Sequence, residues 1–201
     1  MKKYIIAVAL TAISCLPIVN TLARQDERAD RPDSIVFARQ LASTDPAVRQ
    51  RAAEELARLV ALDQKKLVEG YLLQEKDKRV RLALSWALYR MGKSALLFQV
   101  VRDLDSGRHD QAVSYLSQLE SADVLYEILK QEDTRPKVVV GLLQVIGRIG
   151  DDAALQQIKQ FEDSYDPNIV EAAKESASLI QQRLGEAQPA TKTRPRTIEK
   201  P

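Results

Sequence analysis

The sequence predicts an all-α fold, and more narrowly an α-solenoid of about five helix pairs. Seven glycines and eight prolines among 201 residues are about 7% of the chain, where about 12% is usual, so turn residues are too few for a hairpin-rich β fold. Apolar residues recur with the period of an amphipathic helix through the middle of the chain. The helical segments also return about every thirty residues, which is typical of a solenoid.

The first 23 residues predict an export signal. Lys2 and Lys3 form a positive end, residues 5–19 are largely apolar, and Ala23 supplies the small residue that signal peptidase requires. We expect cleavage after Ala23, a mature chain that begins at Arg24, and no membrane span after cleavage. The protein is therefore expected to be periplasmic or secreted.

Cys15 leaves a second interpretation of this segment open. The run Ala12-Ile13-Ser14-Cys15 resembles a lipidation motif, so the protein could instead be lipid-anchored at Cys15. An uncleaved anchor is the third alternative. The residues after Cys15 are apolar, which favours cleavage at Ala23, because the chain after a lipidated cysteine is usually polar.

Composition divides the rest of the chain into three parts. Residues 24–33 are charged and without period, which predicts a linker. Residues 34–184 carry the helical pattern. Residues 185–201 hold three prolines and no apolar period, which predicts a disordered tail.

Each predicted unit of the helical region consists of two helices. One apolar stripe marks the second helix of unit two, and the same spacing returns 58 residues later in unit four. These stripes are Val80, Leu84, Ala87, Leu88 and Met91, and then Val138, Leu142, Val145, Ile146 and Ile149. The first helices of the five units are expected at residues 34–42, 64–73, 94–104, 122–130 and 153–161.

Several residues predict where these helices begin and end. Asp45, Asp77 and Asp166 are expected to cap helix starts, because an aspartate side chain accepts backbone N–H bonds there and a following proline loses no needed donor. Four glycines are expected to end helices in the left-handed conformation. They are Gly92, Gly107, Gly150 and Gly185.

Two segments resemble HEAT repeats of the short bacterial type: residues 45–59 (DPAVRQRAAEELARL) and 77–92 (DKRVRLALSWALYRMG). This family includes the HEAT-like repeats of phycobilisome lyases. The D-P-x-V-R motif is complete in unit one. Lys78 replaces its proline in unit two, and Glu171 stands in place of its arginine in unit five. The resemblance covers about residues 34–184. It implies a right-handed superhelix, armadillo-like in architecture, whose second helices line a concave face that holds another protein.

Residues for catalysis are scarce in this sequence. One histidine and one cysteine exclude a Cys/His zinc cage, and His109 beside Asp110 is either a general base or a solvated residue at a helix start. A lyase or hydroxylase function by family analogy would need several metal-binding histidines. A formal charge of +2 and the export signal argue against nucleic-acid binding. We expect no cofactor, a monomer, and a scaffold or adaptor that binds an unknown protein or peptide.

The candidate partner-binding residues are aromatic and basic. Trp86, Tyr89 and Tyr115 would form an exposed anchor on the concave face, because tryptophan, tyrosine and arginine are favoured at interfaces. An arginine column of Arg58, Arg90 and Arg148 would flank it. The alternatives are that Trp86 packs against the next unit and that the arginines form a solvated edge.

Overall fold

The computed structural model describes residues 31–131 and 133–187, and within them all regular structure is helical, which confirms the predicted all-α class. The α-helices are α2 (Arg31–Gln40), α3 (Pro46–Arg58), α4 (Lys65–Gln74), α5 (Lys78–Arg90), α6 (Leu97–Arg102), α7 (His109–Leu116), α8 (Asp123–Leu129), α9 (Pro136–Ile149), α10 (Asp152–Lys159) and α11 (Pro167–Ala187). Three short 3₁₀ helices, η1 (Leu62–Gln64), η2 (Ser94–Leu96) and η3 (Asp103–Asp105), lie in the connections. The predicted signal segment with Cys15, Ala23 and Arg24 lies outside the described residues.

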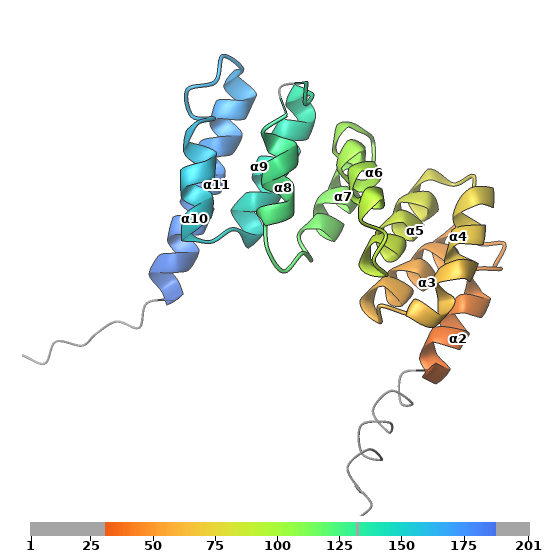
Figure 1. The fold of residues 1–201 in the computed structure, drawn as a ribbon. Helices are drawn as coiled ribbons and strands as arrows, with labels where there is room; N and C mark the ends of the chain where they lie inside the picture. Colours follow the sequence, from red (N-terminus) through yellow and green to blue (C-terminus); the bar gives the residue numbers. More distant parts are fainter. Residues whose placement is uncertain (1–30, 132, 188–201) are drawn as a thin grey trace, which may run out of the picture.

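The helices follow one another along an extended array (Figure 1). Each even-numbered helix packs on the odd-numbered helix that follows it, and the odd-numbered helices contact one another in succession from α3 to α11. Contacts therefore join neighbours in the chain, as in a repeat protein. No helix in the described part of the chain combines the length and the apolarity that crossing a membrane requires.

Helix lengths differ from the expectation in the middle of the chain. The segment predicted as one helix over 94–104 is divided among η2, α6 and η3, so that α6 is only six residues long. At the two ends the helices run further than predicted. α2 begins at Arg31, where Pro32 and Asp33 suit a first turn. α11 continues through Gly185 to Ala187.

The aspartate caps are confirmed. The Asp45 side chain accepts the backbone N–H of Ala47 at 2.8 Å. Asp77 accepts those of Arg79 and Val80 at 2.8 and 3.1 Å. Asp166 accepts the N–H of Asn168 at 2.9 Å.

The glycine prediction is correct only at Gly92, whose φ is +87°. Gly107 has no positive φ, Gly150 has φ −68°, and Gly185 lies inside α11. Gly150 is needed for space instead, because a Cβ there would lie 2.6 Å from the Cβ of Ala154. The other left-handed residue is Val60 (φ 48°), which ends unit one as Gly92 ends unit two.

The predicted apolar stripes form the core. In α5, Val80, Leu84 and Leu88 are at most 1% exposed. Small residues let α3 and α5 approach closely: Ala52, Ala53, Ala83 and Ala87 are fully buried.

Candidate functional site

Trp86 is part of the core, so the hypothesis of an exposed aromatic anchor is wrong. Its side chain is 1% exposed and that of Tyr115 is 4% exposed. The Trp86 ring stacks on Tyr115 and Tyr89, with ring centroids 5.8 and 5.4 Å away. The alternative, in which Trp86 packs against the next unit, is confirmed. The sequence pattern did not separate the two cases, because both faces of a helix held between neighbours are apolar.

Polar side chains cover this aromatic cluster. The Tyr115 hydroxyl donates to Glu54 Oε1 at 2.5 Å, and Gln111 donates to that hydroxyl at 2.8 Å. Gln50 donates to the same Glu54 oxygen at 2.8 Å. Burial raises the pKa of Tyr115 well above its ordinary value, so its hydroxyl remains a donor even in alkaline solution. These bonds join α3 to α7 across α5.

The three arginines lie in the last turns of α3, α5 and α9 and have different surroundings. The Arg58 side chain is 64% exposed and pairs with Glu55 at 2.8 Å. Arg90 lies 5.8 Å from the Trp86 ring centroid and donates to the Gln118 carbonyl at 3.4 Å. Arg148 is exposed at the end of α9. They match the predicted alternative of a charged edge better than a binding site.

His109 links two helices and is neither a free base nor a solvated residue. Its Nδ1 lies 2.8 Å from the Leu104 carbonyl oxygen and its Nε2 lies 2.9 Å from the Gln144 side-chain oxygen. The two ring nitrogens therefore contact η3 and α9 from α7. Within the described residues, no group of three or more His, Cys, Asp or Glu side chains could hold a metal ion.

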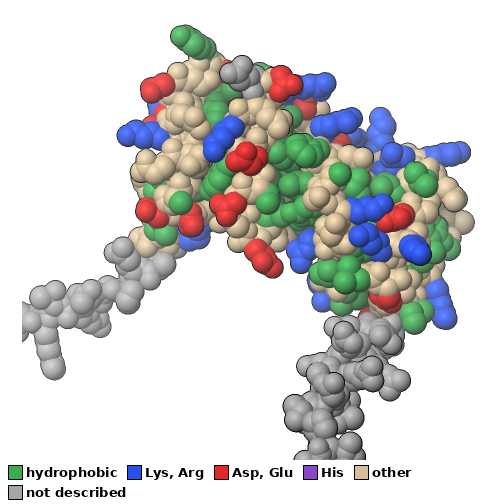
Figure 2. Space-filling view, viewed as in Figure 1, with side chains coloured by type: hydrophobic (Ala, Val, Ile, Leu, Met, Phe, Trp, Pro, Cys, Tyr) green, Lys and Arg blue, Asp and Glu red, His purple; other side chains and the backbone are tan. Residues whose placement is uncertain are grey.

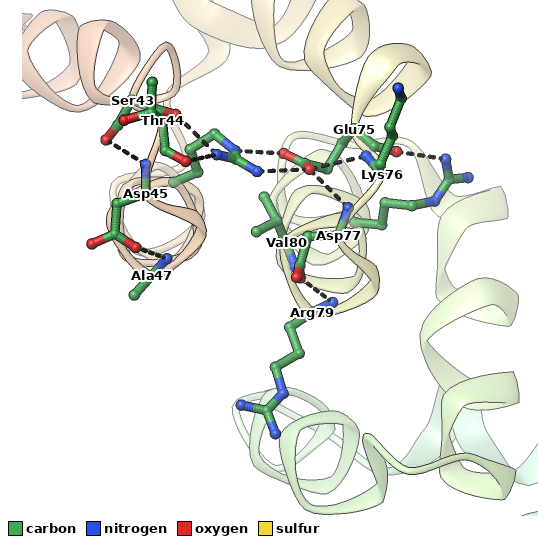
Figure 3. Close-up of polar contacts among 11 residues, drawn as sticks. Ser43, Thr44, Asp45, Ala47, Glu75, Lys76, Asp77, Arg79 and Val80 are labelled. Carbon is green, nitrogen blue, oxygen red and sulfur yellow. Dashed lines mark hydrogen bonds and ion pairs between the residues drawn. The ribbon is translucent and has the colours of Figure 1, made fainter.

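The D-P-x-V-R arginine of unit one, Arg49, joins that unit to the next through its bonds with Ser43, Thr44 and Glu75, which Figure 3 labels. Arg49 donates to both oxygens of Glu75, at 2.7 and 2.9 Å, and to the carbonyls of Ser43 and Thr44. The Arg49 bonds hold the pKa of Glu75 below its ordinary value. This motif residue therefore has a structural role at the α4–α5 turn.

An open groove of about 870 Å³ lies at the middle of the array. We call it the basic groove. Its apolar lining consists of Leu82, Phe98, Val101, Ile128 and Val138, and its basic lining of Lys78, Arg81, Arg102, Arg108 and Arg135. Figure 2 shows apolar side chains gathered between α6 and α8, with lysine and arginine side chains on the α6 side. The groove exists because the short α6 does not pack closely against α8.

The basic side chains of the groove are not all neutralised. Arg108 bonds to Asp103, and Arg135 pairs with Asp105 at 3.0 Å. Lys78 and Arg102 have no acidic partner among the described residues. Asp103 and Asp133 are the acidic side chains of the lining, against five basic ones. The groove thus presents positive charge above an apolar floor.

Sequence reasoning missed this site because its residues are spread from Lys78 to Val138. One sequence signal was Asp103 near the end of the helix expected over 94–104, with Asp105 and Gly107 directly after it. That signal does not fix the spacing between two helices.

The chain was compared with known proteins. No protein-family model and no curated protein matches it significantly. Among solved structures it is similar to the crystal structure of an engineered protein, with 17% identity over 80% of this chain and 84% of that chain and a TM-score of 0.36. Similarity at that level supports no statement about function.

Proposed function

We propose that this protein is a non-catalytic scaffold or adaptor that binds an acidic, partly apolar segment of another protein in the basic groove. The observation that carries the proposal is the combination in one groove of the apolar lining with Lys78 and Arg102, which lack acidic partners among the described residues. Complementary charge directs encounter and selects partners, and burial of an apolar side chain supplies affinity. The proposed binding site is thus the groove lined by α5, α6, α8 and α9, in place of the predicted anchor at Trp86.

We further propose that the chain is a HEAT-like solenoid of right-handed sense. The consecutive pairing of helices and the role of Arg49 at the α4–α5 turn support a repeat architecture. The D-P-x-V-R residues of unit one carry the resemblance. Far from the groove, the repeats would act as a rigid frame.

Export remains part of the proposal. The pattern of residues 1–23 supports a periplasmic or secreted protein, with lipidation at Cys15 as the alternative. Intact-mass measurement of protein from its native host tests this. A mature N-terminus at Arg24 supports cleavage, whereas a lipid adduct on Cys15 or retention of Lys2 contradicts it.

Fluorescence anisotropy with synthetic peptides tests the binding function. A labelled peptide that alternates glutamate with leucine or tyrosine should bind the protein beginning at Arg24. Replacing its glutamates by lysine, or its apolar residues by serine, should abolish binding. Because the groove is charged, affinity for the first peptide should fall as salt rises.

Charge reversal within the groove supplies the matched comparison. Arg102→Glu should weaken peptide binding about tenfold, because it removes an unpaired cation and adds a repulsive charge. Lys159→Glu makes the same charge change on the exposed surface of α10 and should leave binding unchanged. Equal loss in both variants would contradict a specific groove. Tighter binding of a single-stranded oligonucleotide than of the peptide would overturn the choice of partner.

A further inference from the structure

The protein itself carries a segment with the chemistry that the basic groove would bind. The connection between α10 and α11 places Glu162, Asp163 and Asp166 around Tyr165. The Tyr165 side chain is fully exposed, at 107% of its reference surface. Among the described residues, no basic side chain pairs with Glu162 or Asp163. We call residues 162–166 the acidic loop.

We infer that the acidic loop of one copy of this chain binds in the basic groove of a second copy. The inference rests on the proposed function, because it takes the groove as a receptor for acidic and apolar groups. It adds a particular occupant, and it makes self-association a competitor of any other acidic partner.

The charged and apolar side chains of the two surfaces support this occupant. The acidic side chains of the loop would meet Lys78 and Arg102, which have no acidic partner among the described residues. Tyr165 would bury its ring against the apolar lining, where Phe98 is 50% exposed. Aromatic pairs of this kind add stability beyond the area that they bury.

The overall charge does not oppose association. The chain has a formal charge of +2, so two copies repel each other weakly, and proteins near neutrality associate more readily. The loop belongs to the last helix pair, and the groove is lined by helices α5, α6, α8 and α9. Each copy therefore carries both the acidic loop and the basic groove. A head-to-tail contact of this type either closes into a ring of copies or grows into an open filament.

Sedimentation velocity over a concentration series tests the inference. The weight-average mass of the wild type should rise with concentration and fall back as salt is added. Tyr165→Ala should weaken association about tenfold, and Asp163→Arg, which adds a charge that the groove repels, should abolish association. Glu120→Arg, a matched change at an exposed residue in the α7–α8 connection, should leave association unchanged.

A charge exchange identifies the two surfaces. Arg102→Glu has a groove that repels the wild-type loop, and Asp163→Arg has a loop that the wild-type groove repels. Each variant alone should remain monomeric, whereas a mixture of the two should associate, because the altered loop fits the altered groove.

The possible failures are distinct. A wild type that stays monomeric at about 0.2 mM while the acidic peptide binds would overturn self-association and leave the proposed function standing. Association that persists in both single variants would also overturn the inference, since the contact would lie elsewhere. Association through the loop without peptide binding would contradict the proposed function instead.

Discussion

The junction between α3 and α5 differs in kind from the junction around α6. α3 and α5 contact each other extensively through buried alanines, and Arg49 fastens the adjoining turn to Glu75. α6 is one and a half turns long, α5 contacts α7 at few positions, and the basic groove opens beside them. The regular junction buries its apolar side chains, whereas the irregular junction leaves Phe98 half-exposed.

The largest effect should come from the aromatic cluster of Trp86, Tyr89 and Tyr115. Trp86→Ala should lower the free energy of unfolding by about 3–5 kcal/mol, because it removes a fully buried indole and leaves a cavity. Urea denaturation followed by circular dichroism measures this loss. Tryptophan emission of the wild type should be blue-shifted and protected from acrylamide. Emission like that of free tryptophan would contradict the burial of Trp86.

The next effect should come from the Arg49–Glu75 pair, whose side chains are only 17% and 7% exposed. Arg49→Met should cost about 2–3 kcal/mol, since it leaves a largely buried carboxylate with only the backbone N–H bonds of Lys76 and Asp77. Arg135→Met, in the irregular part, breaks a pair whose arginine is 76% exposed and should cost less than about 1 kcal/mol. Equal costs in urea denaturation would remove the contrast between the two junctions.

The effect of Arg49→Met should depend on pH. The pKa of Glu75 is lowered in the folded protein, chiefly by its hydrogen bonds with Arg49. The stabilisation is therefore complete above the ordinary glutamate pKa of about 4.3 and is lost as pH falls through the lowered value. The stability difference between wild type and Arg49→Met should shrink between pH values of about 5 and 3. A constant difference would show that Arg49 acts through packing alone.

A smaller effect is expected where α9 and α11 meet, the other extensive junction. Gly147→Ala should cost about 1–3 kcal/mol, because its Cβ would lie 2.9 Å from the Ser176 Cα. Gly70→Ala in α4 is the control, as nothing lies within 4 Å of its added Cβ, and it should stabilise the protein by up to about 1 kcal/mol. Thermal unfolding measures both changes in stability, a loss for Gly147→Ala and a gain for Gly70→Ala. Stabilisation by Gly147→Ala would disprove the close approach.

The smallest effect compares the ends of units one and two. Gly92→Val should cost about 1–2 kcal/mol, because valine is strained at the positive φ of this position. Val60 already tolerates that strain in unit one. Val60→Gly should therefore gain less than about 1 kcal/mol, since relief of strain is offset by loss of a half-buried side chain. Chemical denaturation of both variants checks the pair.

The sequence predicted best what depends on near neighbours. The caps at Asp45 and Asp77 and the stripe of α5 follow from local hydrogen bonding and helical period, and the structure has them. The exposure of Trp86 could not be predicted, because it depends on whether Tyr115 of another helix covers it. The basic groove depends on the distance between α6 and α8, which no local pattern encodes.

The bond between Tyr115 and Glu54 joins residues 61 positions apart, from α3 to α7 on either side of α5. This bond spans three consecutive odd-numbered helices. Bending the array away from the face that carries the bond would lengthen it, so the bond should resist such bending in the first three units. Because α5 and α7 contact each other at few positions, this bond would carry much of the resistance to bending beside the groove.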